Sequence, residues 1–424
     1  MAYDLRRLAP EKAIPPFEPA WKRWAALFVV VVGGGAFGML RLWGSAAPTH
    51  TTWFWFWVVG IPFLFWLIPF LAYLGVLQSR RHRAEEFNED RADYIRAVQR
   101  EGGVPLHVLA SGFIFSALEH ENTPVAVANK ELRLEPRSRF AGDDRTVEAR
   151  WIAPSGLGWL PGDDAVDSAR HEDVFASVTN YLVGQIAETI RALPENIRLT
   201  VDVRVDSLLD LSCMDALWRA AWEAQRLRPV PAPIVRIIAP ELIDVDNWLD
   251  GDPAFASDEV KVVCAIRLEP LLNVVPNAGV AEAGAILVLA SDSLVRRKRL
   301  PGMALLYRPE RGGEADLSQL LLQALFWSRA KGGELFDHWF SGGAQAPLQR
   351  ALQGQLVSQG VAVGEAIGLQ GHHDIDLRIG SARFVAPWLV IALAAAYAGM
   401  CSRKQLVSVT GDNVLTIAVI APRS

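Results

Sequence analysis

Two long apolar stretches near the N-terminus constrain this chain more than any other feature. Residues 24–43 (WAALFVVVVGGGAFGMLRLW) contain a single charge, Arg41, close to their end, and residues 53–77 (WFWFWVVGIPFLFWLIPFLAYLGVL) contain none. A helix needs about 20 apolar residues to cross the hydrocarbon core of a bilayer. We therefore predict a transmembrane helical hairpin over residues 24–77. The alternative is a buried hydrophobic hairpin inside a globular domain.

The charges that flank the hairpin predict its orientation. The short linker between the two spans carries no Lys or Arg. Cations gather at the other end of each span: Arg6, Arg7, Lys12, Lys22 and Arg23 before the first, and Arg80, Arg81, Arg83 and Arg91 after the second. Because positively charged flanks stay in the cytoplasm, we expect a two-pass membrane protein with both ends in the cytoplasm. Residues 1–23 then form a cytoplasmic tail, and residues 78–104 form a charged linker helix that leads to a cytoplasmic main domain.

Composition and motifs exclude several classes of protein. The chain has 42 Lys and Arg against 47 Asp and Glu, a net charge of −5, whereas a nucleic-acid binder normally carries a basic face. Its three cysteines are widely spaced and form neither a disulfide framework nor a zinc site. The sequence contains no P-loop lysine motif and no HExxH motif. We therefore predict no cofactor, no metal and no nucleic acid, and we expect membrane lipid and a protein as partners.

Residues 105–424 alternate β-branched apolar runs with amphipathic stretches, which predicts an α/β domain whose sheets are covered by helices. The predicted strands cover residues 105–113, 197–205, 233–239, 260–268, 284–291 and 414–422. The predicted helices cover residues 174–193, 213–227, 317–330, 347–360 and 384–400. The last helix is apolar on every side, but it is short for a span and rich in alanine. We therefore place it in the core of the domain.

The order of segments from residue 258 onwards resembles the second part of a thiolase-like fold, most closely that of a β-ketoacyl synthase. Residues 258–270 (DEVKVVCAIRLEP) resemble the strand that closes the first half of that fold, and residues 281–291 (AEAGAILVLAS) resemble the strand that opens the second. A strand, small-residue loop and helix follow at 336–356, and a strand, Ile-Gly pair and buried Ala-rich helix at 376–400. The resemblance implies two duplicated halves with five-stranded sheets, at residues 105–257 and 258–424.

The resemblance also implies where catalytic groups stand, and there this sequence departs from the family. Two histidines polarise the thioester in β-ketoacyl synthases, and the matching positions hold Ser341 and Ser381. A hydroxyl does not replace an imidazole that stabilises an oxyanion or moves a proton near pH 7. We therefore predict a pseudo-enzyme without catalytic residues.

Three other residues are candidates for chemistry. Cys213 stands at the start of a predicted helix, where the helix dipole lowers the pKa of a thiol, although an incidental, partly buried thiol also fits. His372 and His373 are neighbours in GHHDID. In an extended segment they point to opposite faces and do not share a metal, and we expect them on the surface or at a loop end.

The combination of a membrane anchor and a catalytically dead thiolase-like body resembles accessory proteins of type VI secretion, which load a toxic effector onto the secretion machinery. We therefore expect an inner-membrane-anchored, non-catalytic scaffold that binds a protein partner, as an effector adaptor. The alternative is a membrane-tethered acyltransferase or condensing-like enzyme that uses Cys213 with His372 or His373. A third hypothesis makes the hairpin the functional part of a transporter or secretion complex.

Overall fold

The computed structural model describes residues 8–43, 48–153, 158–236, 241–250, 258–343, 347–359, 361, 371–411 and 413–423. The chain divides into two compact units, an N-terminal unit, Tyr3–Val98, and a body, Gln99–Ser424, which we describe one at a time. The predicted strand 233–239 and the loop within 340–352 extend partly outside the described residues.

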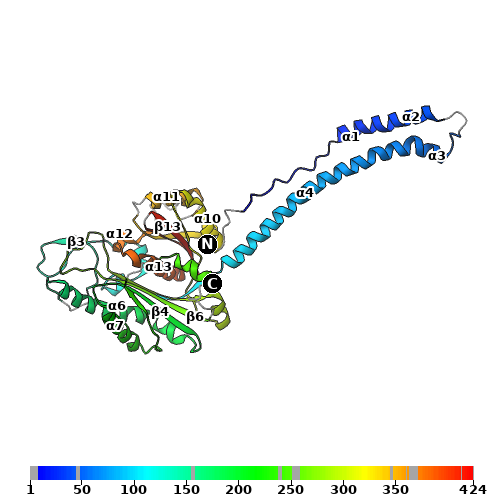
Figure 1. Cartoon of the computed structure of the whole chain (residues 1–424). Helices are drawn as coiled ribbons and strands as arrows, with labels where there is room; N and C mark the ends of the chain where they lie inside the picture. Colours follow the sequence, from blue (N-terminus) through cyan, green and yellow to red (C-terminus); the bar gives the residue numbers. More distant parts are fainter. Residues whose placement is uncertain are drawn as a thin grey trace. The chain divides into compact units, whose positions relative to one another are not determined.

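The N-terminal unit is a helical hairpin (Figure 1). Its first arm comprises α1 Trp21–Phe28, the π-helical turn η2 Val29–Gly33 and α2 Gly34–Leu42, and its second comprises α3 Thr52–Trp55, η3 Phe56–Gly60 and α4 Ile61–Gly102. The helical stretches Trp21–Leu42 and Thr52–Gly102 are long and apolar enough to cross a membrane. The predicted second span and the predicted linker helix form one continuous helix, because residues 76–101 contain neither Gly nor Pro.

Aromatic side chains join the two arms of the hairpin. The ring centroid of Trp24 lies 6.4 Å from that of Trp66 and 5.3 Å from that of Tyr73. The indole N–H of Trp66 donates to the carbonyl oxygen of Trp24 at 3.0 Å. Farther along, Gly35 makes room for Pro62, because an added Cβ would lie 2.7 Å from the proline ring. These contacts hold the arms side by side.

The segment before α1 lies along α4 instead of forming a separate tail. The backbone of Lys12 exchanges two hydrogen bonds of 2.9 Å with the side-chain amide of Asn88. Arg91 donates to the carbonyl oxygen of Ala9 at 2.9 Å and pairs with Glu11 at 3.2 Å. We call residues 8–20 the N-terminal strap. Its contacts place both ends of the hairpin on the same side, as a two-pass arrangement requires.

The body repeats a five-strand pattern within one sheet. The first repeat contains β1 Leu106–Ile114, β4 Arg198–Asp206, β5 Ile234–Arg236, β6 Glu259–Arg267 and β7 Ala283–Ser291; the second contains β8 Ala304–Leu306, β10 Leu335–Ser341, β11 His372–Asp374, β12 Lys404–Gly411 and β13 Val414–Pro422. Numbered within each repeat, the strands lie in the order three, two, four, five, one, and the two first strands pair with each other. In both repeats the fifth strand is antiparallel to its neighbours. This is the duplication that the resemblance implies.

The strand order places the boundary between the two halves later in the chain than we expected. β6 and β7 are the fourth and fifth strands of the first sheet, and β7 pairs with both β6 and β1. The second half begins with β8. The expected division at 257/258 is therefore wrong, because AEAGAILVLAS completes the first half instead of opening the second.

Helices cover the sheet in the same order in both repeats. α6 Asp164–Ala192 and α10 Leu317–Ser328 follow the first strands, α7 Leu211–Ala224 and α11 Pro347–Ser358 follow the second, and α8 Asp244–Leu249 and α13 Ala386–Cys401 follow the third. Figure 1 shows α10 and α11 on one outer face of the body, α6 and α7 on the other, and α13 between the two halves. The shorter elements are η4 Glu119–Glu121, α5 Pro124–Ala128, β2 Pro136–Ser138, β3 Thr146–Glu148, α9 Asp292–Lys298, β9 Glu310–Gly312, η5 Glu314–Asp316, η6 Gly332–Glu334, α12 Ile375–Ile379 and η8 Arg383–Val385.

α13 is the centre of the core. Its sequence, APWLVIALAAAYAGMC, is apolar on every side, and it contacts strands of both repeats. The stretch Arg383–Cys401 is also long and apolar enough to cross a membrane, yet most of its side chains are buried between the two halves of the sheet. The prediction of a buried helix at 384–400 is confirmed. Its alanines let both halves of the sheet approach closely.

Three local predictions differ from the structure. The helix predicted at 174–193 begins ten residues earlier, at Asp164, where the side chain of Asp163 accepts the backbone N–H groups of Ala165 and Val166. Residues 376–379 belong to helix α12, and the strand before Gly380 is β11. β12 was not predicted at all.

Candidate functional site

The resemblance to β-ketoacyl synthases aligns Ser341 and Ser381 with the family's two histidines, and each serine stands beside a glycine that the backbone requires. Gly342 has a φ of +110°, and an added Cβ would lie 2.4 Å from the carbonyl oxygen of Thr410. Gly380 has a φ of +96°, and an added Cβ would lie 2.8 Å from another backbone carbonyl oxygen. Positive φ favours glycine because it has no Cβ. The glycine turns are therefore present beside both serines.

The hydroxyl of Ser341, at the end of β10, is held by a carboxylate. Ser341 Oγ donates to Asp376 Oδ1 at 2.7 Å, and the N–H of Gly342 donates to Asp376 Oδ2 at 2.7 Å. Burial raises the pKa of Asp376, while the hydrogen bonds from Gly342 and Ser341 act in the opposite direction. Within the described residues, neither Ser341 nor Asp376 bonds to a histidine. The hydroxyl therefore lacks the imidazole base that activates catalytic serines.

Ser381 lies shortly before α13 and contacts its neighbours through its backbone. Its N–H donates to the carbonyl oxygen of Gly279 at 2.7 Å, and its own carbonyl oxygen accepts from Ala281 and from Arg267, each at 3.1 Å. These bonds fix the turn that leads into α13. The serine side chain takes no part in them.

His372 and His373 lie on β11 and are buried, with 8% and 3% of their surface exposed. His373 Nε2 lies 2.9 Å from Asp337 Oδ1, and Tyr397 of α13 packs against its ring. The ring of His372 lies on the opposite face, 5.4 Å from that of His338. The expectation of opposite faces is confirmed. The expectation of a surface position is wrong, because β11 pairs with β10 and α13 covers His373.

Cys213 lies in the first turn of α7, where its N–H donates to Asp210 at 2.7 Å. Burial, together with Glu172 and Asp210, raises the pKa of its thiol, whereas a reactive thiol has a lowered pKa. In the part of the chain that the structure describes, the thiol has no histidine partner. In the duplicated fold α7 is the counterpart of the outer helix α11. The enzyme hypothesis is therefore not favoured.

We expect Cys213 to react slowly with iodoacetamide at neutral pH. Because its pKa is raised, the reactive thiolate is scarcer than in an ordinary cysteine, and the rate should rise about tenfold per pH unit until the pH passes the pKa. Site-resolved mass spectrometry of the alkylated full-length chain measures this rate, with glutathione as the reference thiol and Cys213→Ser as the blank. Alkylation faster than that of glutathione at pH 7 would overturn this assignment.

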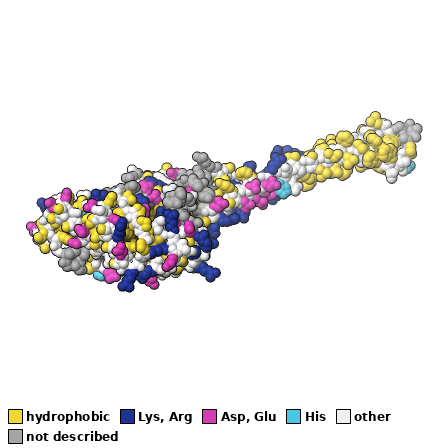
Figure 2. All heavy atoms as spheres, turned by 60° about the horizontal axis from the view of Figure 1, so that its bottom comes forward, with side chains coloured by type: hydrophobic (Ala, Val, Ile, Leu, Met, Phe, Trp, Pro, Cys, Tyr) yellow, Lys and Arg dark blue, Asp and Glu magenta, His cyan; other side chains and the backbone are white. Residues whose placement is uncertain are grey.

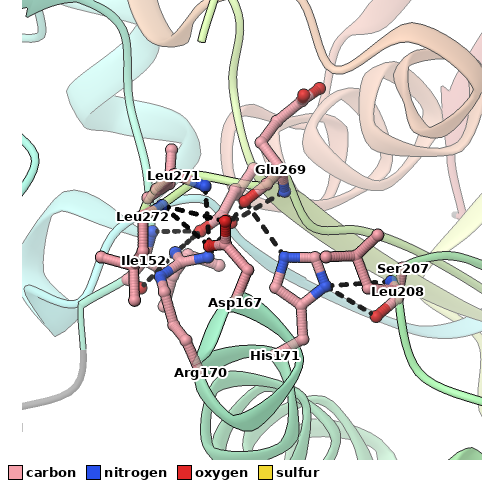
Figure 3. A network of polar contacts seen from close by, with 10 residues as sticks. Ile152, Asp167, Arg170, His171, Ser207, Leu208, Glu269, Leu271 and Leu272 are labelled. Atoms are coloured by element: carbon pink, nitrogen blue, oxygen red, sulfur yellow. Dashed lines mark hydrogen bonds and ion pairs between the residues drawn. The ribbon is translucent and has the colours of Figure 1, made fainter. Parts of the chain in front are cut away.

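A buried polar network around Asp167, Arg170 and His171 of α6 lies at the carboxyl ends of β4 and β6 (Figure 3). Within it, Arg170 pairs with Glu282 at 2.7 Å, and both side chains are fully buried. Arg170 also donates to the carbonyl oxygen of Glu269 at 3.1 Å. The carboxylate of Glu282 accepts the backbone N–H groups of Ile152 at 2.8 Å and of Glu269 at 2.9 Å. One pair of charges therefore fixes three segments that are far apart in the sequence.

Two further side chains of α6 complete this polar network. Asp167 accepts the backbone N–H groups of residues 271–273 at 2.8–3.0 Å. His171 Nδ1 accepts the N–H of Leu208 at 3.1 Å, so Nε2 carries the proton and donates to the carbonyl oxygen of Glu269 at 3.1 Å. Burial lowers the pKa of His171 to about 4. His171 is therefore neutral near pH 7 and holds loops instead of exchanging protons.

Arg267 extends the network to Ser381. It ends β6 with 1% of its surface exposed, pairs with the carboxylate of Glu269 and donates to the carbonyl oxygen of Ser381 at 3.1 Å. Burial lowers the pKa of Arg267 to about 10, so the guanidinium stays charged near pH 7. The carboxyl ends of β4 and β6 are therefore occupied by mutually paired charges.

Sequence reasoning missed this network, although the sequence holds a signal for it. Asp167, Arg170 and His171 precede Val174 at the spacing i, i+3, i+4, i+7, so they continue the buried stripe of α6. Charged residues at buried positions need partners. The partners lie between 18 and 112 residues away, and nothing local identifies them.

The first repeat covers the inner face of its sheet less completely than the second. The 16-residue helix α13 reaches β10, where Tyr397 packs on Trp339 with ring centroids 5.3 Å apart. Its counterpart α8 has only six residues and meets α13 through Trp248, whose ring lies 5.8 Å from that of Trp388. Beside α8, the inner face of β4 carries polar side chains, among them Asp202.

A groove of about 740 Å³ lies over this polar face. We call it the sheet-face groove; its walls include Arg198, Thr200, Asp202 and Arg204 of β4, Glu259 and Lys261 of β6, and Pro231 and Pro233 of the connector before β5. A second cavity of about 400 Å³, lined by Trp218 and Trp222 of α7, shares Arg219 and Pro231 with it. Charges of both signs line the groove, which suits a polypeptide segment better than an acyl chain.

Comparisons with known proteins identify the fold. No protein-family model and no curated protein sequence matches the chain. Solved ketosynthase structures match 76% of it at 9% identity: the ketosynthase from module 1 of the bacillaene synthase from Bacillus amyloliquefaciens FZB42, with a TM-score of 0.52 over 74% of that chain, and the ketosynthase from module 6 of the bacillaene synthase from Bacillus subtilis 168, with a TM-score of 0.51 over 72% of that chain. Identity this low shows the fold alone. The predicted thiolase-like, ketosynthase-like fold is confirmed.

Proposed function

We propose that this chain is a membrane-anchored, non-catalytic scaffold of ketosynthase-like fold that binds a protein partner. One observation carries the proposal. The strand order, the central helix α13 and both glycine turns are present, yet the positions that the resemblance aligns with the family's imidazoles hold Ser341 and Ser381, and Asp376 accepts a hydrogen bond from Ser341. Chemistry on a thioester needs groups that stabilise an oxyanion and move a proton. A binding role needs only the packed layers.

The hairpin supports membrane anchoring. Both arms are long and apolar enough to span a bilayer, and the N-terminal strap joins their polar ends through Lys12 and Asn88. Together with the cations at these ends, this favours a two-pass arrangement in a bacterial inner membrane, with the N-terminus and the body in the cytoplasm.

The sheet-face groove supports the partner role. It runs along β4 and β6 and its walls carry charges of both signs, so a segment of another protein can pack there. More specifically, we propose that the partner is a toxic effector of a type VI secretion system, which this chain loads onto the secretion machinery. This part of the proposal rests on the resemblance of a membrane-anchored, non-catalytic thiolase-like protein to accessory proteins of that system.

The experiment combines secretion with direct binding. In the bacterium that encodes the chain, deleting its gene should abolish secretion of one effector and leave other type VI effectors unchanged. That purified effector should then bind the full-length chain in detergent, and Arg198→Glu with Arg219→Glu should weaken binding at least tenfold. Arg296→Glu with Arg297→Glu, on exposed turns of α9, is the matched control. Unchanged secretion of every effector would contradict the adaptor form.

The other hypotheses predict different results. A condensing-like enzyme would form product from acyl and malonyl thioesters, and Cys213→Ala would abolish that activity. If the hairpin were itself the functional part of a transporter or secretion complex, exchanging it for an unrelated hairpin would destroy function. A scaffold tolerates this exchange, because its partner binds the body.

A further inference from the structure

The N-terminal unit carries a group of cations where its apolar surface ends. We call this group the cation belt; it consists of the exposed side chains Lys22, Arg23, Arg80, Arg81 and Arg83. No charged side chain stands in α4 between Ile61 and Ser79, and its first carboxylate is Glu85. Figure 2 shows Lys and Arg side chains gathered between the apolar surface of the hairpin and its acidic continuation.

Contacts between the two arms bring these cations to a similar depth. The N–H of Ala20 donates to the hydroxyl of Tyr73 at 3.4 Å, so the start of α1 lies level with Tyr73. Arg80, Arg81 and Arg83 follow about 10–15 Å farther along α4, at about 1.5 Å of rise per residue. The headgroup layer of a bilayer is roughly 5–8 Å thick on each side, and long cationic side chains reach several ångströms along a helix. All five cations can therefore meet the same layer of headgroups.

The protein neutralises only part of this charge. Arg81 pairs with Glu85 at 2.7 Å, and Arg83 donates to the hydroxyl of Ser79 at 3.3 Å. Among the described residues, Lys22, Arg23 and Arg80 form no hydrogen bond or ion pair through their side chains. The chain as a whole has a net charge of −5, so this excess of positive charge is local.

From this arrangement we propose that the cation belt binds the headgroups of anionic phospholipids. The proposal rests on the membrane anchoring proposed above and names the lipid class. Guanidinium groups bind phosphate oxygens in a bidentate manner, and clusters of Lys and Arg beside a span attract anionic lipids. The N-terminal strap keeps the cations of both arms in one leaflet, because Lys12 holds Asn88 beyond the belt.

Quenching of tryptophan fluorescence tests the proposal. The full-length chain is placed in vesicles of phosphatidylcholine and phosphatidylglycerol, and one lipid at a time carries bromine on its acyl chains. Bromine quenches a tryptophan that it touches, and Trp21 and Trp24 stand beside Lys22 and Arg23. We expect brominated phosphatidylglycerol to quench more than brominated phosphatidylcholine at equal mole fraction, with several-fold preferential association that high salt reduces.

Substitutions test whether the cation belt causes this preference for phosphatidylglycerol. Arg80→Gln, Arg81→Gln and Arg83→Gln together should bring the ratio of quenching by the two brominated lipids close to one, since each cation near an anionic surface contributes roughly fivefold to binding. The matched control, Arg296→Gln, Arg297→Gln and Lys298→Gln on α9, removes the same number of cations and should leave the preference unchanged. Loss of preference in the α9 variant alone, or competition by millimolar inorganic phosphate, would overturn the proposal.

The same measurement separates two kinds of failure. If both brominated lipids quench equally in the unaltered chain, the hairpin is in the bilayer and only the cation-belt proposal fails. If neither lipid quenches, the hairpin is not in the bilayer, and the membrane anchoring fails as well.

Discussion

Replacing Arg170 by methionine is expected to lower the free energy of unfolding by about 3–5 kcal/mol, the largest effect of any single side chain considered for this molecule. The change leaves Glu282 fully buried without its cation. It also removes the hydrogen bond from Arg170 to the carbonyl oxygen of Glu269. Urea-dependent proteolysis of the full-length chain in detergent measures the loss through the fraction of intact body.

The control for this prediction removes both charges. Arg170→Met with Glu282→Leu should recover much of the lost stability, because a buried ion pair contributes little net stability over apolar side chains of similar size. Recovery will be incomplete, since the N–H groups of Ile152 and Glu269 lose their acceptor. A single variant as stable as the unaltered chain would show that the pair is not buried as described.

Removing residues 8–77 is expected to move the protein from the membrane pellet to the soluble fraction. The deletion takes away both apolar arms and leaves the rest of α4, whose exposed part is charged. The full-length chain should resist extraction by alkaline carbonate, because burying two spans of about 20 apolar residues in lipid is highly favourable. Fractionation followed by immunoblotting reads the outcome.

An unrelated two-pass hairpin in place of residues 21–77 is the matched control and should stay in the pellet. If the deleted protein remains bound to membranes, then the body itself binds lipid, and the basic residues Arg296, Arg297 and Lys298 on α9 become the first to test. Extraction of the full-length chain by carbonate would contradict the anchoring.

Much of the fold could be predicted because its buried helices and strands are either amphipathic or apolar along their whole length. β7 reads AGAILVLAS and is buried along nearly its whole length, and α13 is apolar on every face, so neither depends on distant residues for its recognition. The order of segments then suggested the thiolase-like arrangement. β12 escaped prediction because its sequence, KQLVSVTG, mixes Ser, Thr and Gln with only three apolar residues.

The boundary between the halves could not be found from local patterns. A buried strand that closes one sheet has the same composition as a strand that opens another, and only the pairing of β7 with both β6 and β1 decides between them. The start of α6 was missed for a related reason. Its first turns bury Asp167, Arg170 and His171, whose partners lie outside this helix, up to 112 residues away, so apolar periodicity begins only at Val174.

The positions of two residues in the candidate site could be predicted: Ser341 lies at the end of a strand and Ser381 lies shortly before a buried helix, as expected. Nothing in the sequence indicated that Asp376 would accept a hydrogen bond from the hydroxyl of Ser341. Nor did it indicate that Arg267 would donate to the backbone carbonyl oxygen of Ser381. Cys213 was a candidate because it stands at the start of a helix, but the duplicated fold shows that this helix, α7, lies on the outside of the body.

The central position of α13 has a consequence for how this molecule can be divided. One helix provides the apolar surface against which the sheets of both repeats pack, since the first repeat's own α8 is too short to do so. Duplication has therefore not produced two independent domains. A chain cut between β7 and β8 would leave the faces of β1, β6 and β7 that pack on α13 without that helix, so the two pieces would need each other in order to fold.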